Sequence, residues 1–228
     1  MSQFLREVKR RASFSPSFIS TTRRFIRQEL QGSEYDFNVA DTLKCYRPCS
    51  LDELITLTNF NKKEIQLIYQ GFKQECPSGI VNEETFRKIF GHFFPCGDTK
   101  QYAHLIFSTF DLRSSGIITF EDFLIGLSTL CRGTIEDRLK WIFKLYDNKK
   151  TGRLTKDDFH VIICAVHSLL GNASNRHNNY IITQEHTTKV FQKFDQKNQG
   201  YITIDDFISI CLQDPMIVQS IEALRVTV

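Results

Sequence analysis

The sequence predicts an all-α protein of four helix–loop–helix units, paired in two lobes with short β bridges between the loops. One observation behind this prediction is a residue skeleton that occurs three times. Two aromatic residues lead into an aspartate, and a glycine follows five residues later. An apolar residue, a threonine, a second aspartate and a phenylalanine complete the pattern. The three copies begin at Asp111, Asp147 and Asp195.

This skeleton is typical of the EF-hand, whose twelve-residue loop turns sharply at a glycine in position six. A fourth, altered copy surrounds Gly79, where Phe72 and Phe86 stand one residue further apart than their counterparts. Pro77 removes a backbone donor inside that turn, so we interpret this first hand as purely structural. We expect hand one to pair with hand two, and hand three with hand four, through the apolar residues at position eight. These are Val81, Ile118, Leu154 and Ile202.

The repeat divides the chain into four parts: a basic N-terminal arm and linker (1–48), an N-lobe (49–130), a C-lobe (131–214) and a C-terminal helix (215–228). This division gives two lobes with two helix–loop–helix units each.

Capping residues refine the expected helices. Ser50 and Asn61 each precede a glutamate by three residues, which predicts helices at about 51–58 and 62–72. The wide spacing before the fourth hand predicts a polar loop at 171–182. Asp214 is expected to cap a short helix that begins near Pro215.

The loops differ from a calcium-binding set. Calcium takes six to eight oxygen ligands, with carboxylates at positions one, three and five and usually a bidentate glutamate at twelve. Here position three is basic in hands two to four (Arg113, Lys149, Lys197), and position twelve is the shorter aspartate. We therefore expect weak binding of calcium or magnesium at most, and no required cofactor. Hand two is the best remaining candidate, and its short aspartate favours Mg²⁺; its ligands would be Asp111, Ser115, Thr119 and Asp122.

Three stretches identify a family resemblance: FKQECPSGIVNEETF, FFPCGD and TFEDFLIGLSTLCRGTIEDRLKWIFKLYD. Residues 42–228 resemble the neuronal calcium sensor family, and within it the Kv channel-interacting proteins, which are auxiliary subunits of A-type voltage-gated potassium channels. The resemblance implies a recoverin-like pair of EF-hand lobes with an apolar groove that clamps a helix from the channel's N-terminus. It also implies competent third and fourth loops, which this sequence lacks. Matching positions assign to the groove Tyr69, Phe86, Phe90, Phe123, Trp141 and Phe143.

The N-terminal arm is strongly basic. Residues 1–30 carry seven Lys or Arg against two Glu, so their net charge is +5, whereas the whole chain has +3. Two interpretations stay open: a passive solvated tail, or an amphipathic arm that meets an anionic membrane surface or a partner. Ser13 follows Arg10-Arg11-Ala12, which resembles the pattern of basic-directed kinases and makes it a candidate phosphorylation site.

Composition and the absence of certain motifs exclude several classes of function for this chain. No run reaches the length of a membrane span, and the seven cysteines show no zinc spacing, which indicates a reducing, intracellular setting. We expect a cytoplasmic protein, peripheral at the plasma membrane, with no nucleic-acid partner. No catalytic motif is present, so we expect no enzyme. The alternative function is a calcium sensor that binds calcium or magnesium and regulates another membrane target by exposing hydrophobic surface.

Overall fold

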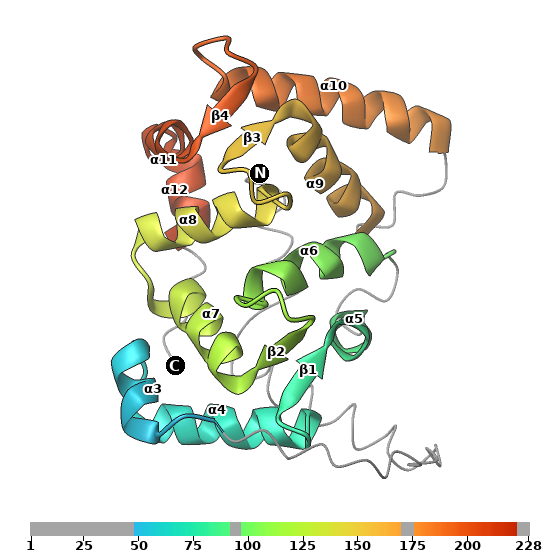
Figure 1. Cartoon of the computed structure of the whole chain (residues 1–228). Coiled ribbons are helices and arrows are strands. Elements are labelled where there is room, and N and C mark those ends of the chain that lie inside the picture. Colours follow the sequence, from blue (N-terminus) through green and yellow to red (C-terminus); the bar gives the residue numbers. More distant parts are fainter. Residues whose placement is uncertain (1–47, 92–96, 170–175, 223–228) are drawn as a thin grey trace.

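The computed structural model describes residues 48–91, 97–169 and 176–222. Within these ranges the chain is helical, with four short strands, and Figure 1 shows the helices in two groups that follow the chain. The expectations for the N-terminal arm and for Ser13 lie outside the described residues.

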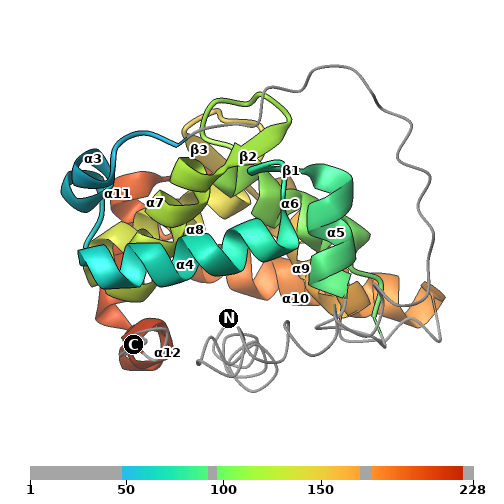
Figure 2. The same ribbon diagram turned by 90° about the horizontal axis from the view of Figure 1, so that it is seen from below.

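The lower group in Figure 1 is the N-lobe, which contains two helix–loop–helix units. In Figure 2, seen from below, α4 lies across the near side of the molecule, with α5 at the end where β1 begins. The elements of this lobe are α3 (Leu51–Leu57), α4 (Lys62–Glu75), β1 (Ile80–Asn82), α5 (Glu83–Gly91), α6 (Lys100–Phe110), β2 (Ile117–Thr119) and α7 (Phe120–Arg132).

The upper group is the C-lobe, which repeats the plan and adds a final helix. Its elements are α8 (Ile135–Tyr146), β3 (Arg153–Thr155), α9 (Lys156–Leu169), α10 (Arg176–Phe194), β4 (Tyr201–Thr203), α11 (Ile204–Gln213) and α12 (Pro215–Glu222).

The predicted pairing of the loops is confirmed. β1 pairs antiparallel with β2 so that Val81 faces Ile118, and β3 pairs with β4 so that Leu154 faces Ile202. All four turn glycines, at 79, 116, 152 and 200, have φ between +72° and +83°. A side chain at such a φ is strained, so position six of each loop requires glycine.

The predicted caps are present. Ser50 and Asn61 both form capping boxes, with the glutamate three residues later bonding back to the cap. Asp214 Oδ1 accepts a hydrogen bond from the amide of Met216 at 3.0 Å, at the start of α12. These bonds satisfy amides that have no partner within the helix.

Two predicted boundaries are wrong. The helix expected at 62–72 continues to Glu75. It ends there because Pro77, two residues later, cannot be accommodated in a further helical turn. The polar loop expected at 171–182 is helical from Arg176 onward, within α10. No Gly or Pro interrupts the stretch from Arg176 to Phe194, and α10 packs along α9, so its polar composition does not prevent a helix.

The buried apolar residues form two cores that meet at α6. The N-lobe core includes Phe107 and Phe110 of α6, whereas Tyr102 and Leu105 of the same helix belong to the C-lobe core. α12 also joins the C-lobe core, through Ile217 and Ile221. The lobes therefore share one helix, and the C-terminal helix is part of the C-lobe packing.

Candidate functional site

The first aspartate of each loop is held by the loop's own backbone. Asp111 accepts hydrogen bonds from the amides of Ser115 and Gly116 at 2.9 and 2.8 Å. Asp147 and Asp195 accept the equivalent amide bonds, at distances between 2.7 and 3.0 Å. Both carboxylate oxygens of each aspartate are engaged, so the loop is closed by protein donors.

Position twelve is occupied by a helix-capping carboxylate. The Thr119 hydroxyl donates to Asp122 Oδ2 at 2.6 Å, while the Asp122 amide donates back to that hydroxyl at 3.2 Å. The Thr155–Asp158 and Thr203–Asp206 pairs repeat the hydroxyl contact at 2.6 and 2.9 Å. The interpretation as helix caps is confirmed for Thr119 and Thr203.

Basic residues at position three approach the same acids. Lys197 Nζ donates to Asp206 Oδ1 at 2.6 Å, and Lys149 Nζ lies 3.8 Å from Asp158 Oδ1. The hydrogen bond from Lys197 lowers the pKa of Asp206, and the same bond raises the pKa of Lys197. Each of these loops therefore contains a cation supplied by its own chain.

The side chains assigned to a groove are mostly half-buried aromatics of the N-lobe. Tyr69 lies edge-on to Phe120, with ring centroids 4.9 Å apart, and Phe86 stacks on Phe90 at 6.0 Å. The ring of Phe123 packs against that of Phe72, with centroids 5.5 Å apart. We call the half-buried residues Tyr69, Phe86, Phe90 and Phe123 the aromatic surface.

The sequence was compared with models of known protein families, and the matches agree with this geometry. Two family models, each described as an EF-hand domain pair, match residues 77–128 and residues 136–212. The chain belongs to the EF-hand superfamily. The two matches lie within the N-lobe and the C-lobe, and EF-hand domains suggest a calcium-sensor-type protein.

The ligand set of these EF-hands differs from the one that calcium prefers. Among the described residues, no three His, Cys, Asp or Glu side chains group in a way that could hold a metal ion. Loop two brings together the predicted ligands Asp111 and Ser115, but the Ser115 hydroxyl lies 3.3 Å from Asp111 Oδ1 and 3.1 Å from the carbonyl of Ile117. Asp122 is 3 % exposed and bonds to Thr119. These oxygens are therefore engaged in internal hydrogen bonds, and position three of the loop is Arg113 in place of an oxygen ligand.

The remaining two residues assigned to the groove are Phe143 and Trp141. Phe143 is 4 % exposed and lies edge-on to Phe207 inside the C-lobe core, so the expectation that it lines a groove is not met. Its position in the third hand matches that of Phe107, which is also core. Trp141 is half-buried and packs against the cores of both lobes, with its ring centroid 6.1 Å from that of Phe110. Its indole nitrogen is buried and has no hydrogen-bond partner in the described part of the chain.

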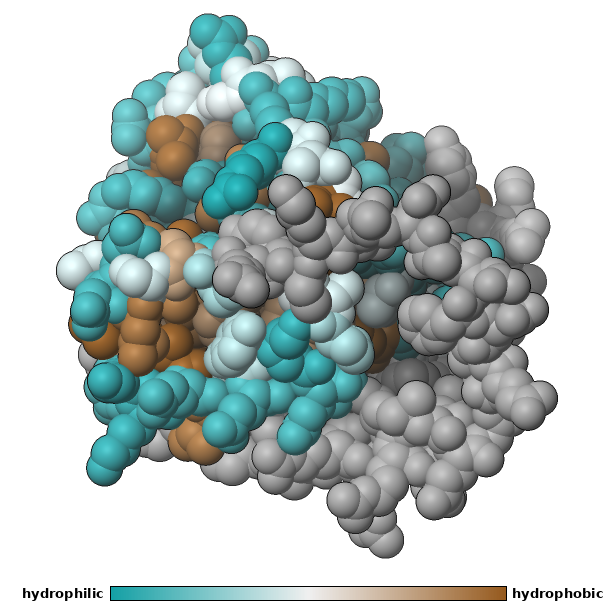
Figure 3. All heavy atoms as spheres, turned by 60° about the horizontal axis from the view of Figure 1, so that its bottom comes forward, coloured by the Kyte–Doolittle hydropathy of each residue, from teal (hydrophilic) through white to brown (hydrophobic). Residues whose placement is uncertain are grey.

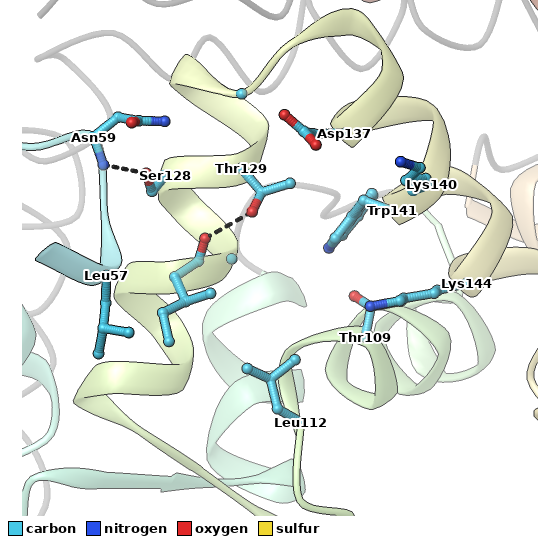
Figure 4. Close-up of a pocket in the computed structure, with 13 residues that line it drawn as sticks. Leu57, Asn59, Thr109, Leu112, Ser128, Thr129, Asp137, Lys140, Trp141 and Lys144 are labelled. Carbon is cyan, nitrogen blue, oxygen red and sulfur yellow. Dashed lines mark hydrogen bonds between the residues drawn. The ribbon is translucent and has the colours of Figure 1, made fainter. Parts of the chain in front are cut away.

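Trp141 also lines a pocket of about 310 Å³ on another face of α7. In Figure 4 its side chain lies between α7 and the Thr109–Leu112 segment, with Lys140 and Lys144 beside it. Leu57 and Leu112 of this pocket are 56 % and 48 % exposed. Figure 3 shows hydrophobic side chains gathered on the side of the molecule where α3, α7 and α8 lie in Figure 1. The pocket contains no other member of the predicted groove.

The structure reveals two contacts that sequence reasoning missed. Arg138 is 2 % exposed and donates to main-chain carbonyls at the ends of two helices. Cys164 Sγ lies 3.4 Å from His160 Nε2, because residues four apart share one face of α9. His160 Nδ1 also contacts the Thr187 hydroxyl at 3.2 Å. The four-residue spacing in a helix is the signal that could have found the second contact.

Five cysteines in the described ranges are free thiols, and three of them, Cys76, Cys131 and Cys211, are buried. Burial raises the pKa of Cys211 to about 12 and that of Cys76 to about 11. No helix in the described ranges is long and apolar enough to cross a membrane.

Proposed function

We propose that this EF-hand protein is an auxiliary regulator that binds an amphipathic helix from the N-terminus of an A-type voltage-gated potassium channel. The observation that carries the proposal is the incomplete burial of α5. This nine-residue helix has Phe86, Ile89 and Phe90 on one side, and none of its residues is fully buried. An apolar helix face that its own lobe covers only in part is suited to a second apolar helix.

The neighbouring helix extends the apolar area. On α4, Ile68 and Tyr69 are half-buried and pack against the N-lobe core. A partner helix with apolar residues at spacings of three, four and seven would present such a stripe to these side chains. Aromatic residues in this position contribute large contact area at low conformational cost.

The identity of the partner rests on the family resemblance, in which the matched stretches cover loop one and the α7–α8 segment. In this proposal the protein acts from the cytoplasmic side of the plasma membrane. The basic arm, residues 1–30, would add attraction to an anionic membrane surface.

A second candidate function is a calcium-dependent sensor of another membrane target. It is favoured by the presence of two EF-hand pairs. In that case calcium or magnesium would open hydrophobic surface before the target binds. The two functions differ in whether binding requires a divalent ion.

Binding of a labelled synthetic helix with the channel's N-terminal sequence tests the proposal. Phe90→Glu with Phe123→Glu should abolish binding, because two carboxylates would be desolvated against the partner. Ile182→Glu is the matched control, since Ile182 is 52 % exposed on α10, outside the aromatic surface. Wild-type binding by the double variant would contradict the proposal. If circular dichroism shows that this variant is unfolded, Phe86→Ala with Phe90→Ala replaces it and must also weaken binding.

A further inference from the structure

Loop four holds an ammonium group beside its position-twelve acid. Lys197 Nζ donates to Asp206 Oδ1 at 2.6 Å, and the other oxygen, Oδ2, accepts from Thr203 at 2.9 Å and from Gln199 at 3.5 Å. Both oxygens of the acid that would bind a metal are therefore engaged. The carboxylate of Asp195 at position one is likewise bonded to two loop amides.

Loop three also places a lysine near its position-twelve acid, at a longer distance and in a more basic setting. Lys149 Nζ lies 3.8 Å from Asp158 Oδ1, and the Asp158 side chain is 7 % exposed. Residues 147–158 contain four basic and three acidic side chains, a net charge of +1. Position seven is Arg153, whose guanidinium carbon lies 4.5 Å from the ring centroid of Tyr201 at position seven of loop four. Each of the paired loops therefore has a lysine at position three, one on either side of the β3–β4 bridge.

We propose that the position-three ammonium takes the structural place of the divalent cation, so that the C-lobe loops keep their paired, closed form without calcium. The cation neutralises the position-twelve carboxylate at the start of the exiting helix, where a bound ion would otherwise do so. A divalent ion entering the loop would have to displace this ammonium and would meet its repulsion. This inference concerns the loops alone and does not depend on which partner binds the aromatic surface.

The chain offers a matched control for this ion pair. Lys193 of α10 pairs with Asp214 at 2.6 Å, and the two side chains are 56 % and 22 % exposed. The Lys197 and Asp206 side chains are 66 % and 21 % exposed at the same distance. The two pairs therefore have similar geometry and solvent screening, but only one lies inside a loop.

The experiment compares full-length wild type, Lys197→Asp and Lys193→Asp. The melting temperature is measured in excess chelator and in excess calcium, and terbium luminescence excited through tyrosine is measured with calcium as competitor. Tyr201 stands at position seven, which supplies a backbone ligand in a calcium loop. Lys197→Asp returns a carboxylate to position three and should bind calcium at least about tenfold more tightly than wild type.

The expected result has three parts. Calcium leaves the melting temperature of wild type unchanged, Lys197→Asp melts below Lys193→Asp in chelator, and calcium raises the melting temperature of Lys197→Asp alone. A calcium-dependent rise in wild type would overturn the proposal. Equal behaviour of the two variants would also overturn it, since the loop pair would then be an ordinary surface ion pair. If Lys197→Asp does not fold, Lys197→Gln must still melt below Lys193→Gln.

Discussion

Replacing Arg138 by methionine should destabilise the junction between the lobes. The guanidinium donates from Nε to the carbonyl of Leu130 at 2.8 Å and from Nη2 to the carbonyl of Cys131 at 3.1 Å. A longer contact of 3.5 Å joins Nη1 to the carbonyl of Ile221. Leu130 lies in the last turn of α7 and Ile221 in the last turn of α12, where carbonyls lack partners within the helix. One cation therefore caps two helix ends and meets the negative end of each dipole.

The magnitude follows from these contacts. A hydrogen bond to a charged donor contributes about 1.5–3 kcal/mol, and Arg138→Met removes two short ones and leaves their acceptors unpaired. Removing the buried charge recovers part of its desolvation cost. We expect the free energy of unfolding to fall by about 2–4 kcal/mol. For a protein of this size the melting temperature should drop by about 5–15 °C.

Thermal unfolding followed by circular dichroism measures the effect. Lys140→Met is the control, because Lys140 is an exposed residue of the same helix that pairs only with Glu136 one turn earlier among the described residues. Arg138→Lys should give an intermediate loss, since one ammonium cannot match the planar fork of a guanidinium. Equal melting temperatures for Arg138→Met and Lys140→Met would refute the reasoning.

Three further predictions concern other parts of the chain. Burial raises the pKa of Glu75 to about 7, so the folded state holds a proton on this carboxyl that the unfolded state releases near pH 4.5. The free energy of unfolding should therefore fall as the pH rises from about 4.5 to 7, and Glu75→Gln should flatten this dependence in thermal melts. Arg113→Asp with Ser115→Asn should give loop two measurable calcium affinity by calorimetry, and an absence of binding would contradict the account of this loop. Phosphorylation of Ser13 should weaken sedimentation with phosphatidylserine vesicles by more than about tenfold, and equal binding by a chain starting at residue 31 would show a passive arm.

Local signals in the sequence were sufficient for much of the fold. The turn glycines require a positive φ, and the Thr–Asp spacings specify helix starts, so both could be predicted from the chain alone. The pairing of Val81 with Ile118 followed because position eight must bridge to a neighbouring loop. The basic residues at position three could also be identified from the sequence, but the ion pair between Lys197 and Asp206 could not.

Other features depend on tertiary placement, which local patterns do not specify. Phe143 and Phe90 are both helical phenylalanines, yet one is core and the other half-buried, because burial is decided by which helix packs opposite. α10 is polar along much of its length and is held as a helix by its packing on α9. From the sequence alone Arg138 would be expected at the surface, like most arginines. The structure shows that it is buried and that it contacts the carbonyl of Ile221 in α12.

Calorimetric titration of the full-length protein with the channel's N-terminal helix tests the central claim most directly. The titration is done once in excess chelator and once in excess calcium. We predict saturable binding with the same dissociation constant in both, because Lys197 already pairs with the acid that a divalent ion would bind in loop four. Binding that appears only with calcium would contradict it and favour the calcium-sensor function, and an absence of binding under both conditions would reject the channel helix as the partner.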